Sequence, residues 1–474
     1  MERRARPRAS PPDPRLAAAR VLLDAAAGRH ADESLDRRAR LLSGPDRALC
    51  HEIAFGALRW KLLLDSRLDA LLSRGLGSLP PPARAVLEVA AYQLLFLDRV
   101  PAYAVLDRAV ENVRDLLPAS QARGLAPVVN ATLRAMAAES REPADASRRV
   151  PAEAVVETRR RPAPRTGAGG AEDLAVATSH PAWLVARWIE RFGPARARAI
   201  LEADNLRPGV HLRPHAARVT AAELAQRLRA EGASVRPHAL HPNCLVLGGG
   251  DPAALAAYRE GLFSMQDVSG QLVSALAAEL ATGLTVDLCA APGGKAGAVA
   301  EKPGSRTILA VDVSARRLAR LLENARRQSL PLLPVVADAR DLALRRPADF
   351  VLADVPCLGT GTLRRRVDAR WRKTPASLPE LTALQRGILS HAADLLAPGG
   401  RLLYATCSLE REENEDAAAW ILAARGDLRL VDLAPHVEPA FRLRAGEASP
   451  AMLFLTPELG DCDGAFAALL EKVA

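Results

Sequence analysis

From residue 262 onward, short apolar runs alternate with longer amphipathic segments, and this alternation constrains the fold more than any other feature of the sequence. The runs LTVDLCAA, TILAVDVS and DFVLADVP are strand-length, whereas segments such as ARRLARLLENARRQS repeat apolar residues at helical spacing. Buried strands that alternate with helices are typical of a doubly wound parallel sheet, whose ligands bind at the carboxyl ends of the strands. We therefore expect an α/β doubly wound, Rossmann-like domain over residues 261–474, with its site at that edge.

The chain before this domain follows other patterns. Residues 15–138 repeat apolar residues at steps of three and four, with Gly, Pro and Asp between the repeats, which predicts an all-α domain. Residues 173–260 mix helical stretches with short strand candidates and predict a small α+β module. The segments 1–14 and 139–172 are rich in Arg and Pro and lack a sustained apolar period, so we expect a disordered basic tail and a linker.

Charge and cysteine usage narrow the functional class. Among 474 residues, 64 are Lys or Arg and 55 are Asp or Glu, and the formal net charge of +9 favours a polyanionic partner such as nucleic acid. The 6 cysteines are scattered without C-x-x-C spacing, which argues against a zinc site and against a disulfide framework. No stretch is long and apolar enough to span a bilayer. We expect a cytoplasmic protein that binds neither a metal nor a membrane.

The first predicted strand ends in DLCAAPGGKAG, residues 287–297, and this turn is a candidate ligand site. A glycine-rich turn between a strand and its helix lets backbone N–H groups approach a ligand and aims a helix N-terminus at it. The spacing is neither that of a dinucleotide fingerprint nor that of a P-loop. A purely structural turn is the alternative for such a sequence taken alone. We expect Cys289 to contact a cofactor only through its backbone.

Carboxylates stand at the ends of the next three predicted strands. Asp312 follows the glycines at the distance where a carboxylate characteristically accepts hydrogen bonds from ribose hydroxyls. Asp338 ends the third strand, where it could meet an adenine amino group, and Asp354 ends the fourth. Each could instead cap a helix. Together with the glycine turn they favour S-adenosylmethionine, because its ribose and adenine need acceptors while it carries no phosphate to cradle.

The fourth and fifth predicted strand ends carry the thiols of Cys357 and Cys407. In the usual methyltransferase strand order these two strands are neighbours, which would bring both thiols to one edge with Asp354. A thiolate that adds to carbon 6 of a pyrimidine converts carbon 5 into a nucleophile able to attack a methylsulfonium group. We expect Asp354 to hydrogen-bond N3 and N4 of a cytosine, where charge changes on addition. These considerations do not decide which thiol attacks.

A basic cluster follows the first of these thiols. Target bases must be unstacked from a duplex or presented single-stranded, so phosphates would border the mouth of such a site. A solvated charged face is the alternative for this cluster, but next to a nucleic-acid site phosphate contact is the better interpretation. The predicted RNA contacts are Arg364, Arg365, Arg366, Arg370 and Lys373.

The motifs LCAAPGGK, AVDVSARRL, DVPCLGTGTLRR and YATCSLEREENE, preceded by FSMQDVSGQL, closely resemble those of the RsmB (Sun or Fmu) family of 16S rRNA cytosine-C5 methyltransferases. The helical N-terminal region is similar to the RNA-binding domain shared with the antitermination factor NusB, notably in LCHEIAFGALRW and GLAPVVNATLRAM. The resemblance implies that Cys407 is the nucleophile and that Cys357 assists product release, the reverse of the order in DNA cytosine methyltransferases. It also implies small-subunit rRNA as the partner, and we expect a monomer.

The resemblance further implies which residues contact S-adenosylmethionine. They are Cys289, Ala290, Ala291, Pro292, Gly293, Gly294, Lys295, Asp312, Asp338 and Asp354. Two alternatives stay open. One is a DNA cytosine methyltransferase that uses Cys357 as its nucleophile, and the other is a non-catalytic RNA-binding or antitermination factor, suggested by the N-terminal region alone.

Overall fold

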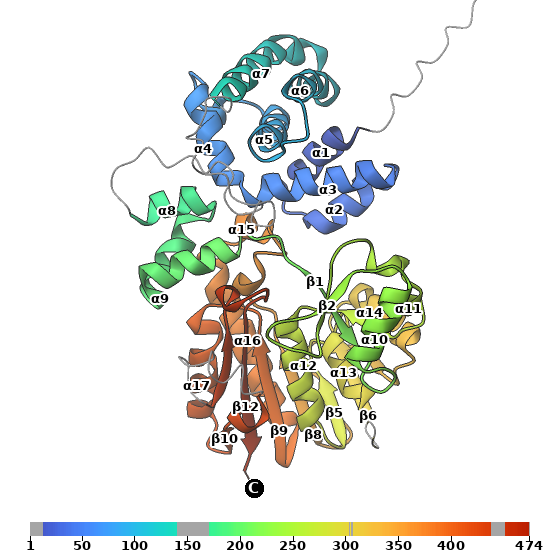
Figure 1. Ribbon diagram of the computed structural model, residues 1–474. Helices are drawn as coiled ribbons and strands as arrows, with labels where there is room; N and C mark the ends of the chain where they lie inside the picture. Colours follow the sequence, from blue (N-terminus) through green and yellow to red (C-terminus); the bar gives the residue numbers. More distant parts are fainter. Residues whose placement is uncertain (1–12, 140–169, 303, 305–306, 438–450, 474) are drawn as a thin grey trace, which may run out of the picture. The chain divides into compact units, whose positions relative to one another are not determined.

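The computed structural model describes residues 13–139, 170–302, 304, 307–437 and 451–473. The contacts divide the chain into two compact units (Figure 1): Met1–Leu206 with Arg366–Arg372, and Arg207–Arg365 with Lys373–Ala474. Most of the predicted tail and most of the predicted linker lie outside the described residues.

The first unit is built from helices, as the apolar spacing of residues 15–138 predicts. Its helices are α1 (Pro14–Ala26), α2 (Ala31–Arg38), α3 (Gly44–Arg59), α4 (Lys61–Leu71), α5 (Pro81–Phe96), α6 (Ala102–Leu116), α7 (Ala119–Glu139), α8 (Ala171–Thr178), α9 (Ala182–Ala203) and α15 (Ala369–Arg372). The Asp13 carboxylate accepts the Arg15 N–H at 2.9 Å, so α1 begins within the segment predicted as tail. The apolar core of this unit includes Val367, far along the chain from the other members. Residues 366–372 therefore fold as part of the helical unit.

Helices α8 and α9 belong to this unit by their contacts, although α9 and most of α8 fall within the segment 173–260 predicted as a separate module. The remainder of that segment forms a four-stranded sheet in the second unit, with the order β2-β3-β1-β4. Its elements are β1 (Val210–Pro214), α10 (Ala221–Ala230), β2 (Val235–Pro237), β3 (Leu245–Leu247), α11 (Ala256–Arg259) and β4 (Phe263–Met265). Leu212, Leu224 and Phe263 are buried in its core. The predicted small α+β domain is thus present.

An eight-stranded sheet forms the rest of the second unit among the described residues. Its strands are β5 (Leu284–Asp287), β6 (Thr307–Asp312), β7 (Leu333–Val336), β8 (Ala348–Asp354), β9 (Leu396–Thr406), β10 (Leu428–Val431), β11 (Met452–Leu455) and β12 (Ala465–Lys472). The order is β10-β12-β9-β8-β5-β6-β7, with β11 paired to β12. Strands β5 to β9 are parallel, and β12 is antiparallel to its neighbours. The predicted Rossmann-like domain is confirmed.

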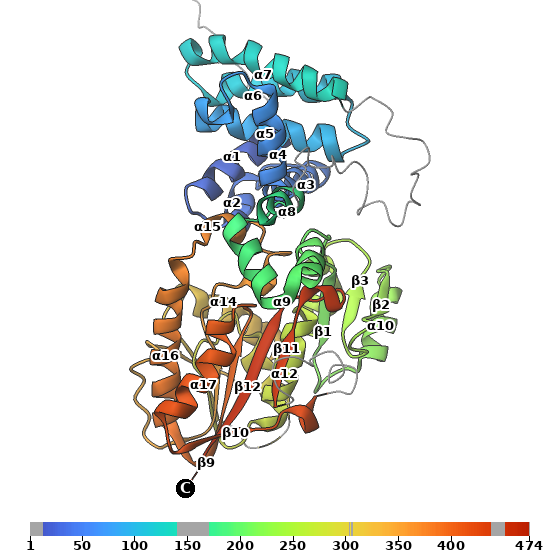
Figure 2. The ribbon, with the colours of Figure 1, turned by 90° about the vertical axis from the view of Figure 1, so that its left-hand side faces the viewer.

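The direction of winding reverses between β5 and β8, which lie side by side at the centre of the sheet. The helices of this domain are α12 (Val268–Leu280), α13 (Gly294–Glu301), α14 (Ala315–Gln328), α16 (Ser377–Leu395) and α17 (Glu415–Ala424). Crossovers between parallel strands are right-handed, so windings that run in opposite directions from the centre place their helices on opposite faces. Figure 2 shows α12 on one side of the sheet and the α16–α17 pair on the other. The reversal leaves a crevice at the carboxyl ends of β5 and β8, where ligands bind in such folds.

A buried ion pair joins the small sheet to the first crossover helix of the large sheet. Nη1 of Arg213 on β1 donates to Oε2 of Glu301 at the end of α13 at 2.7 Å, and its Nη2 lies 2.7 Å from Oε1. Arg213 is 8% and Glu301 3% exposed, so the two charges compensate each other away from water. The small sheet therefore anchors the helix that follows the glycine turn.

Within the part of the chain that the structure describes, no helix combines the length and apolar character needed to cross a membrane.

Candidate active site

The glycine turn lies between the end of β5 at Asp287 and the start of α13 at Gly294. Gly293 has φ +103°, and a Cβ there would lie 2.9 Å from Cγ of Leu321, so both conformation and space require glycine. No side chain caps the N-terminus of α13 at Gly293. Its first N–H groups therefore have no acceptor within the helix and can donate to a bound ligand.

One carboxylate oxygen of Asp312, at the end of β6, is available to a ligand. Its Oδ1 accepts the Ser314 N–H at 2.8 Å and lies 2.8 Å from the Arg317 guanidinium. Its Oδ2 is buried and has no hydrogen-bond partner among the described residues. A buried, unpaired carboxylate oxygen is costly, and a ribose hydroxyl would satisfy it. These residues fit the cofactor that the sequence predicts.

Asp338, past the end of β7, is placed differently. It is partly exposed, and its carboxylate forms an ion pair with Arg340 at 2.6 Å. The hydrogen bonds from Arg340 hold the pKa of Asp338 at about 2, so it is an ionised acceptor. Contact with an adenine amino group stays a prediction for this residue.

Two groups at the base of the glycine turn have raised pKa values, which disfavours their ionised forms. Burial, together with the nearby charge of Asp354, raises the pKa of Asp287 to about 7. Burial and the neighbouring carboxylates, Asp287 first among them, also raise the pKa of the Cys289 thiol. The Cys289 N–H donates to Asp287 Oδ1 at 3.3 Å. Cys289 is therefore a poor nucleophile, and its backbone contact with a cofactor stays a prediction.

Lys295 connects the glycine turn to the end of β8. Its Nζ donates to Asp354 Oδ2 at 2.6 Å. Burial opposes the ammonium charge, but Asp354 and then Cys407 raise the pKa of Lys295 above its usual range. The cation thus faces both the predicted cytosine-binding carboxylate and one of the two thiols.

The two predicted catalytic cysteines meet. Sγ of Cys357, in the loop after β8, lies 3.4 Å from Sγ of Cys407, which follows β9. The parallel pairing of these strands explains the approach, because Asp354 at the end of β8 is in register with Ala405 near the end of β9. The hydrogen bond to Cys407, burial and the charge of Glu413 together raise the pKa of Cys357 well above its ordinary value. Lys295 thus interacts electrostatically with Cys407, and Glu413 with Cys357.

Backbone hydrogen bonds hold the two cysteine loops against Gly464, the residue before β12, in an arrangement that we call the clasp. The Gly361 N–H donates to the Cys407 carbonyl at 3.0 Å, and the Gly464 N–H donates to the Gly361 carbonyl at 2.7 Å. A Cβ on Gly361 would lie 2.7 Å from Cα of Gly464 and 2.9 Å from the Cys407 oxygen. Only glycine at these positions permits the approach. The clasp fixes the main chain on both sides of Cys407.

The structure does not support phosphate contacts by the first two arginines of the basic cluster. Arg364 is 2% exposed and pairs with Asp461. Arg365 pairs with Asp267 at 2.6 Å and with Asp463 at 3.0 Å. Their charges are compensated by carboxylates of the protein itself. The predicted RNA contact is therefore wrong for both residues.

Arg370 also departs from the prediction. It is 1% exposed, and within the helical unit it donates to the Asp204 carbonyl at 2.7 Å and to Asn205 Oδ1 at 2.8 Å. Such a guanidinium stabilises the fold and does not meet phosphate. Of the cluster, Arg366 is exposed and Lys373 is partly exposed. The prediction of RNA contact is kept for these two residues.

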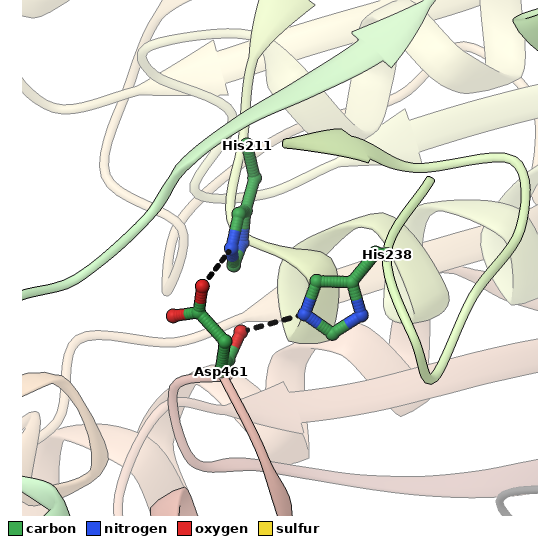
Figure 3. Close-up of side chains that lie close together, drawn as sticks. All are labelled: His211, His238 and Asp461. Carbon is green, nitrogen blue, oxygen red and sulfur yellow. Dashed lines mark hydrogen bonds and ion pairs between the residues drawn. The ribbon is translucent and has the colours of Figure 1, made fainter. Parts of the chain in front are cut away.

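His211, His238 and Asp461 form a cluster that resembles a metal site at first sight (Figure 3). The ring nitrogens of His211 lie 3.0 Å from Asp267 and 3.3 Å from Asp461. Burial opposes a charge on His211, but these two carboxylates raise its pKa. His238 Nε2 donates to the Asp461 carbonyl at 2.8 Å, and its Nδ1 accepts the Leu240 N–H at 3.1 Å. With both nitrogens of His238 engaged, the cluster is an ion network that fixes the loop before β12.

The structure adds two residues that the sequence did not single out. Gln266 lies against the glycine turn, with Nε2 3.1 Å from where a Cβ of Gly294 would be, and its Oε1 is buried without a partner among the described residues. It can therefore offer an acceptor to a cofactor. Glu413 is 0% exposed and accepts the N–H of Leu358, next to Cys357. Both stand in motifs that carry the family resemblance, but only the folded chain shows what they touch.

A doubly wound sheet whose strand ends carry a glycine turn, a ribose-type carboxylate and paired thiols defines a Rossmann-like methyltransferase. The chain matches the 16S rRNA methyltransferase RsmB/F family over residues 276–471, the NusB family over 12–138 and an RsmF/B-like ferredoxin-like domain over 180–253. With these matches and the relatives described next, the chain belongs to the RsmB/F family of 16S rRNA methyltransferases. The resemblance stated from the motifs is confirmed.

Relatives match along almost the whole chain. A probable ribosomal RNA small subunit methyltransferase B of Synechocystis sp. is 31% identical over 452 residues, which cover 94% of this chain and 95% of the relative. The ribosomal RNA small subunit methyltransferase B of Pseudomonas putida is 32% identical over 469 residues, which cover 98% of this chain and 99% of the relative. The crystal structure of PH0851 matches with a TM-score of 0.74 and 24% identity, covering 99% of this chain and 100% of that one, and supports the fold.

Proposed function

We propose that this protein transfers a methyl group from S-adenosylmethionine to carbon 5 of a cytosine in 16S rRNA, with Cys407 as the nucleophile. The observation that carries the proposal is the 3.4 Å separation of two thiols whose surroundings differ in charge. Lys295 faces Cys407, whereas Glu413 faces Cys357. Because a thiolate is the reactive form, the thiol beside the cation is the better nucleophile and the thiol beside the carboxylate stays protonated.

Cys407, Asp354 and Cys357 each have a separate role in the proposed reaction. Cys407 adds to carbon 6, which makes carbon 5 nucleophilic, and Asp354 holds the N3 and N4 edge of the base. When bound, S-adenosylmethionine supplies an electrophilic methyl group to carbon 5. A water molecule then takes the carbon 5 proton, the electron pair of that bond restores the double bond between carbons 5 and 6, and the bond between sulfur and carbon 6 breaks to release the thiolate. The thiol of Cys357, within hydrogen-bond distance of Cys407, stabilises the departing thiolate.

The glycine turn, Asp312 and Asp338 are the proposed cofactor contacts, together with Lys295 and Asp354. Their support is the unpartnered Oδ2 of Asp312 and the uncapped start of α13. Arg366 and Lys373 are the proposed phosphate contacts. Replacing both with alanine should lower the slope of log affinity against log salt by about one to two, since each contact with single-stranded RNA contributes about 0.7.

The test is release of tritium from carbon 5 of labelled cytosine, measured with 16S rRNA and with a DNA of the same sequence. Release that requires S-adenosylmethionine and occurs with RNA alone supports the proposal. Release with DNA, abolished by Cys357→Ala and not by Cys407→Ala, would identify the rival DNA enzyme. A protein that releases no tritium yet binds rRNA normally would instead be a non-catalytic binding factor. Bisulfite sequencing of rRNA from a deletion strain then locates the cytosine.

A further inference from the structure

Glu413 is a buried carboxyl group that the proposed chemistry uses only through its charge, beside Cys357. It lies at the end of the short turn Arg411–Glu413 and is 0% exposed. Its two oxygens lie 2.9 and 3.2 Å from the Leu358 backbone nitrogen, and Oε1 accepts from Gln385 Nε2 at 2.9 Å. Burial raises the pKa of Glu413, and the Ser408, Leu358 and Gln385 groups around it oppose that rise. A carboxylate that is fully removed from water needs such donors to stay ionised.

The Glu413 carboxylate links the segments of the two cysteines. Leu358, which donates to it, directly follows Cys357, and Glu413 itself lies six residues after Cys407. Gln385, on α16, also donates to the carbonyl of Pro356 at 2.9 Å, so the Cys357 loop is held on both sides. Glu413 is therefore the point where the main chain around each cysteine is tied to the other.

The donors around Glu413 are neutral, so its negative charge is not cancelled by the contacts that the described residues make with it. The titratable groups near it are Cys357, Tyr404 and Glu410, which carry no positive charge in any protonation state. Cys357 in turn faces Cys407, Tyr404 and Glu413. The cation of the site, Lys295, faces Cys407.

We propose that Glu413 is a positioning residue that assigns the two thiols their roles: it holds both loops at the observed sulfur distance and keeps the proton on Cys357. The geometry that carries this is one carboxylate, on the segment that follows Cys407, bonded to the residue that follows Cys357. The proposal rests on the proposed function, because the roles are those of nucleophile and release group. Its consequence is that Cys357 serves as a hydrogen-bond donor to Cys407, and a proton need not move between them.

Thiol alkylation tests this without RNA or cofactor, so absence of methylation would not affect the outcome. Iodoacetamide is added to the full chain with Cys407→Ala, and modification of Cys357 is followed by peptide mass spectrometry over a range of pH. With Glu413→Gln added, Cys357 should react at least threefold faster at pH 8, about half a pKa unit, because only its thiolate reacts. Glu413→Asp keeps the charge and should restore most of the slow rate.

Glu412→Gln, the same change at the neighbouring position, is the matched control and should leave the rate unchanged. Circular dichroism checks that each variant is folded. Gln385→Met removes a donor that keeps Glu413 ionised and should speed alkylation of Cys357 in the same direction as Glu413→Gln. The proposal is overturned if Glu413→Gln is folded and reacts at the parent rate, or if Glu413→Asp reacts as fast as Glu413→Gln.

Discussion

The sulfur atoms of Cys357 and Cys407 lie 3.4 Å apart although 50 residues separate them in sequence. Each follows a central strand of the large sheet, and these strands, β8 and β9, pair in parallel. Their surroundings differ, because Lys295 faces one thiol and Glu413 the other. We therefore expect the two thiols to have different roles in the reaction.

Cys407→Ala should abolish the covalent adduct between protein and 16S rRNA, because the nucleophile is lost. Cys357→Ala should allow attack but slow release, so that the protein accumulates as an adduct with methylated RNA. A denaturing gel of protein mixed with labelled rRNA and S-adenosylmethionine distinguishes the two. Loss of the adduct in Cys357→Ala together with its persistence in Cys407→Ala would reverse the roles.

Lys295→Met should slow alkylation of Cys407 by iodoacetamide about tenfold, measured in a chain that also carries Cys357→Ala. The ammonium group that stabilises a negative sulfur is removed, and a tenfold change corresponds to about one pKa unit. Lys302→Met, at the C-terminal boundary of the same helix, is the control and should have no effect. A rate for Lys295→Met equal to that of the parent would show that Lys295 does not act on Cys407.

Gly361→Ala should destabilise the second unit by about 1–3 kcal/mol and abolish adduct formation, because the new Cβ meets backbone atoms that cannot rotate away. Gly426→Ala, where a Cβ meets nothing within 4 Å, is the matched control. Urea unfolding and the adduct gel measure the two effects. A stable, active Gly361→Ala variant would mean that the clasp between the cysteine loops and Gly464 can open without consequence.

Asp287 should make stability depend on pH. Its pKa of about 7 in the folded protein lies above the value of about 3.9 expected for an unfolded chain, so the folded state binds more protons between these values. The stabilisation is complete below about pH 4 and is lost as the pH rises through 7. Asp287→Asn should therefore raise the free energy of unfolding at pH 8, relative to pH 5, by an amount on the order of 2–4 kcal/mol. Urea titrations at both pH values check this, with the exposed Asp341→Asn as a control that should show no such gain.

Arg213→Met should cost about 3–5 kcal/mol of stability, because Glu301 is left charged and buried without its partner. The double variant Arg213→Met with Glu301→Met should recover most of the loss, since no isolated charge remains. Urea unfolding of the two single variants and the double variant gives the coupling energy. Additive losses in the double variant would show that the pair contributes nothing beyond packing.

Most of the fold is predictable from local pattern, but the partners of the arginines are not. The run at 364–366 looks like a nucleic-acid contact because its charges are adjacent in sequence. In the structure Arg364 and Arg365 are paired with Asp461 and Asp463, which are 97 and 98 residues away. Charge density along a chain does not say which carboxylates the fold will bring to it, so the sequence could not exclude an internal ion network.

The sequence by itself determined the sheet, its glycine turn and the strand ends at which ligand-type residues stand, because hydrophobic periodicity and glycine conformation are local properties. It also determined which two thiols are candidates for catalysis. The tertiary structure alone decided what surrounds each thiol: Lys295 arrives from the first crossover helix, and Glu413 from the turn before α17. The physical reason is that electrostatic effects on a thiol depend on distance through space and on burial, and neither quantity is set until the chain has folded.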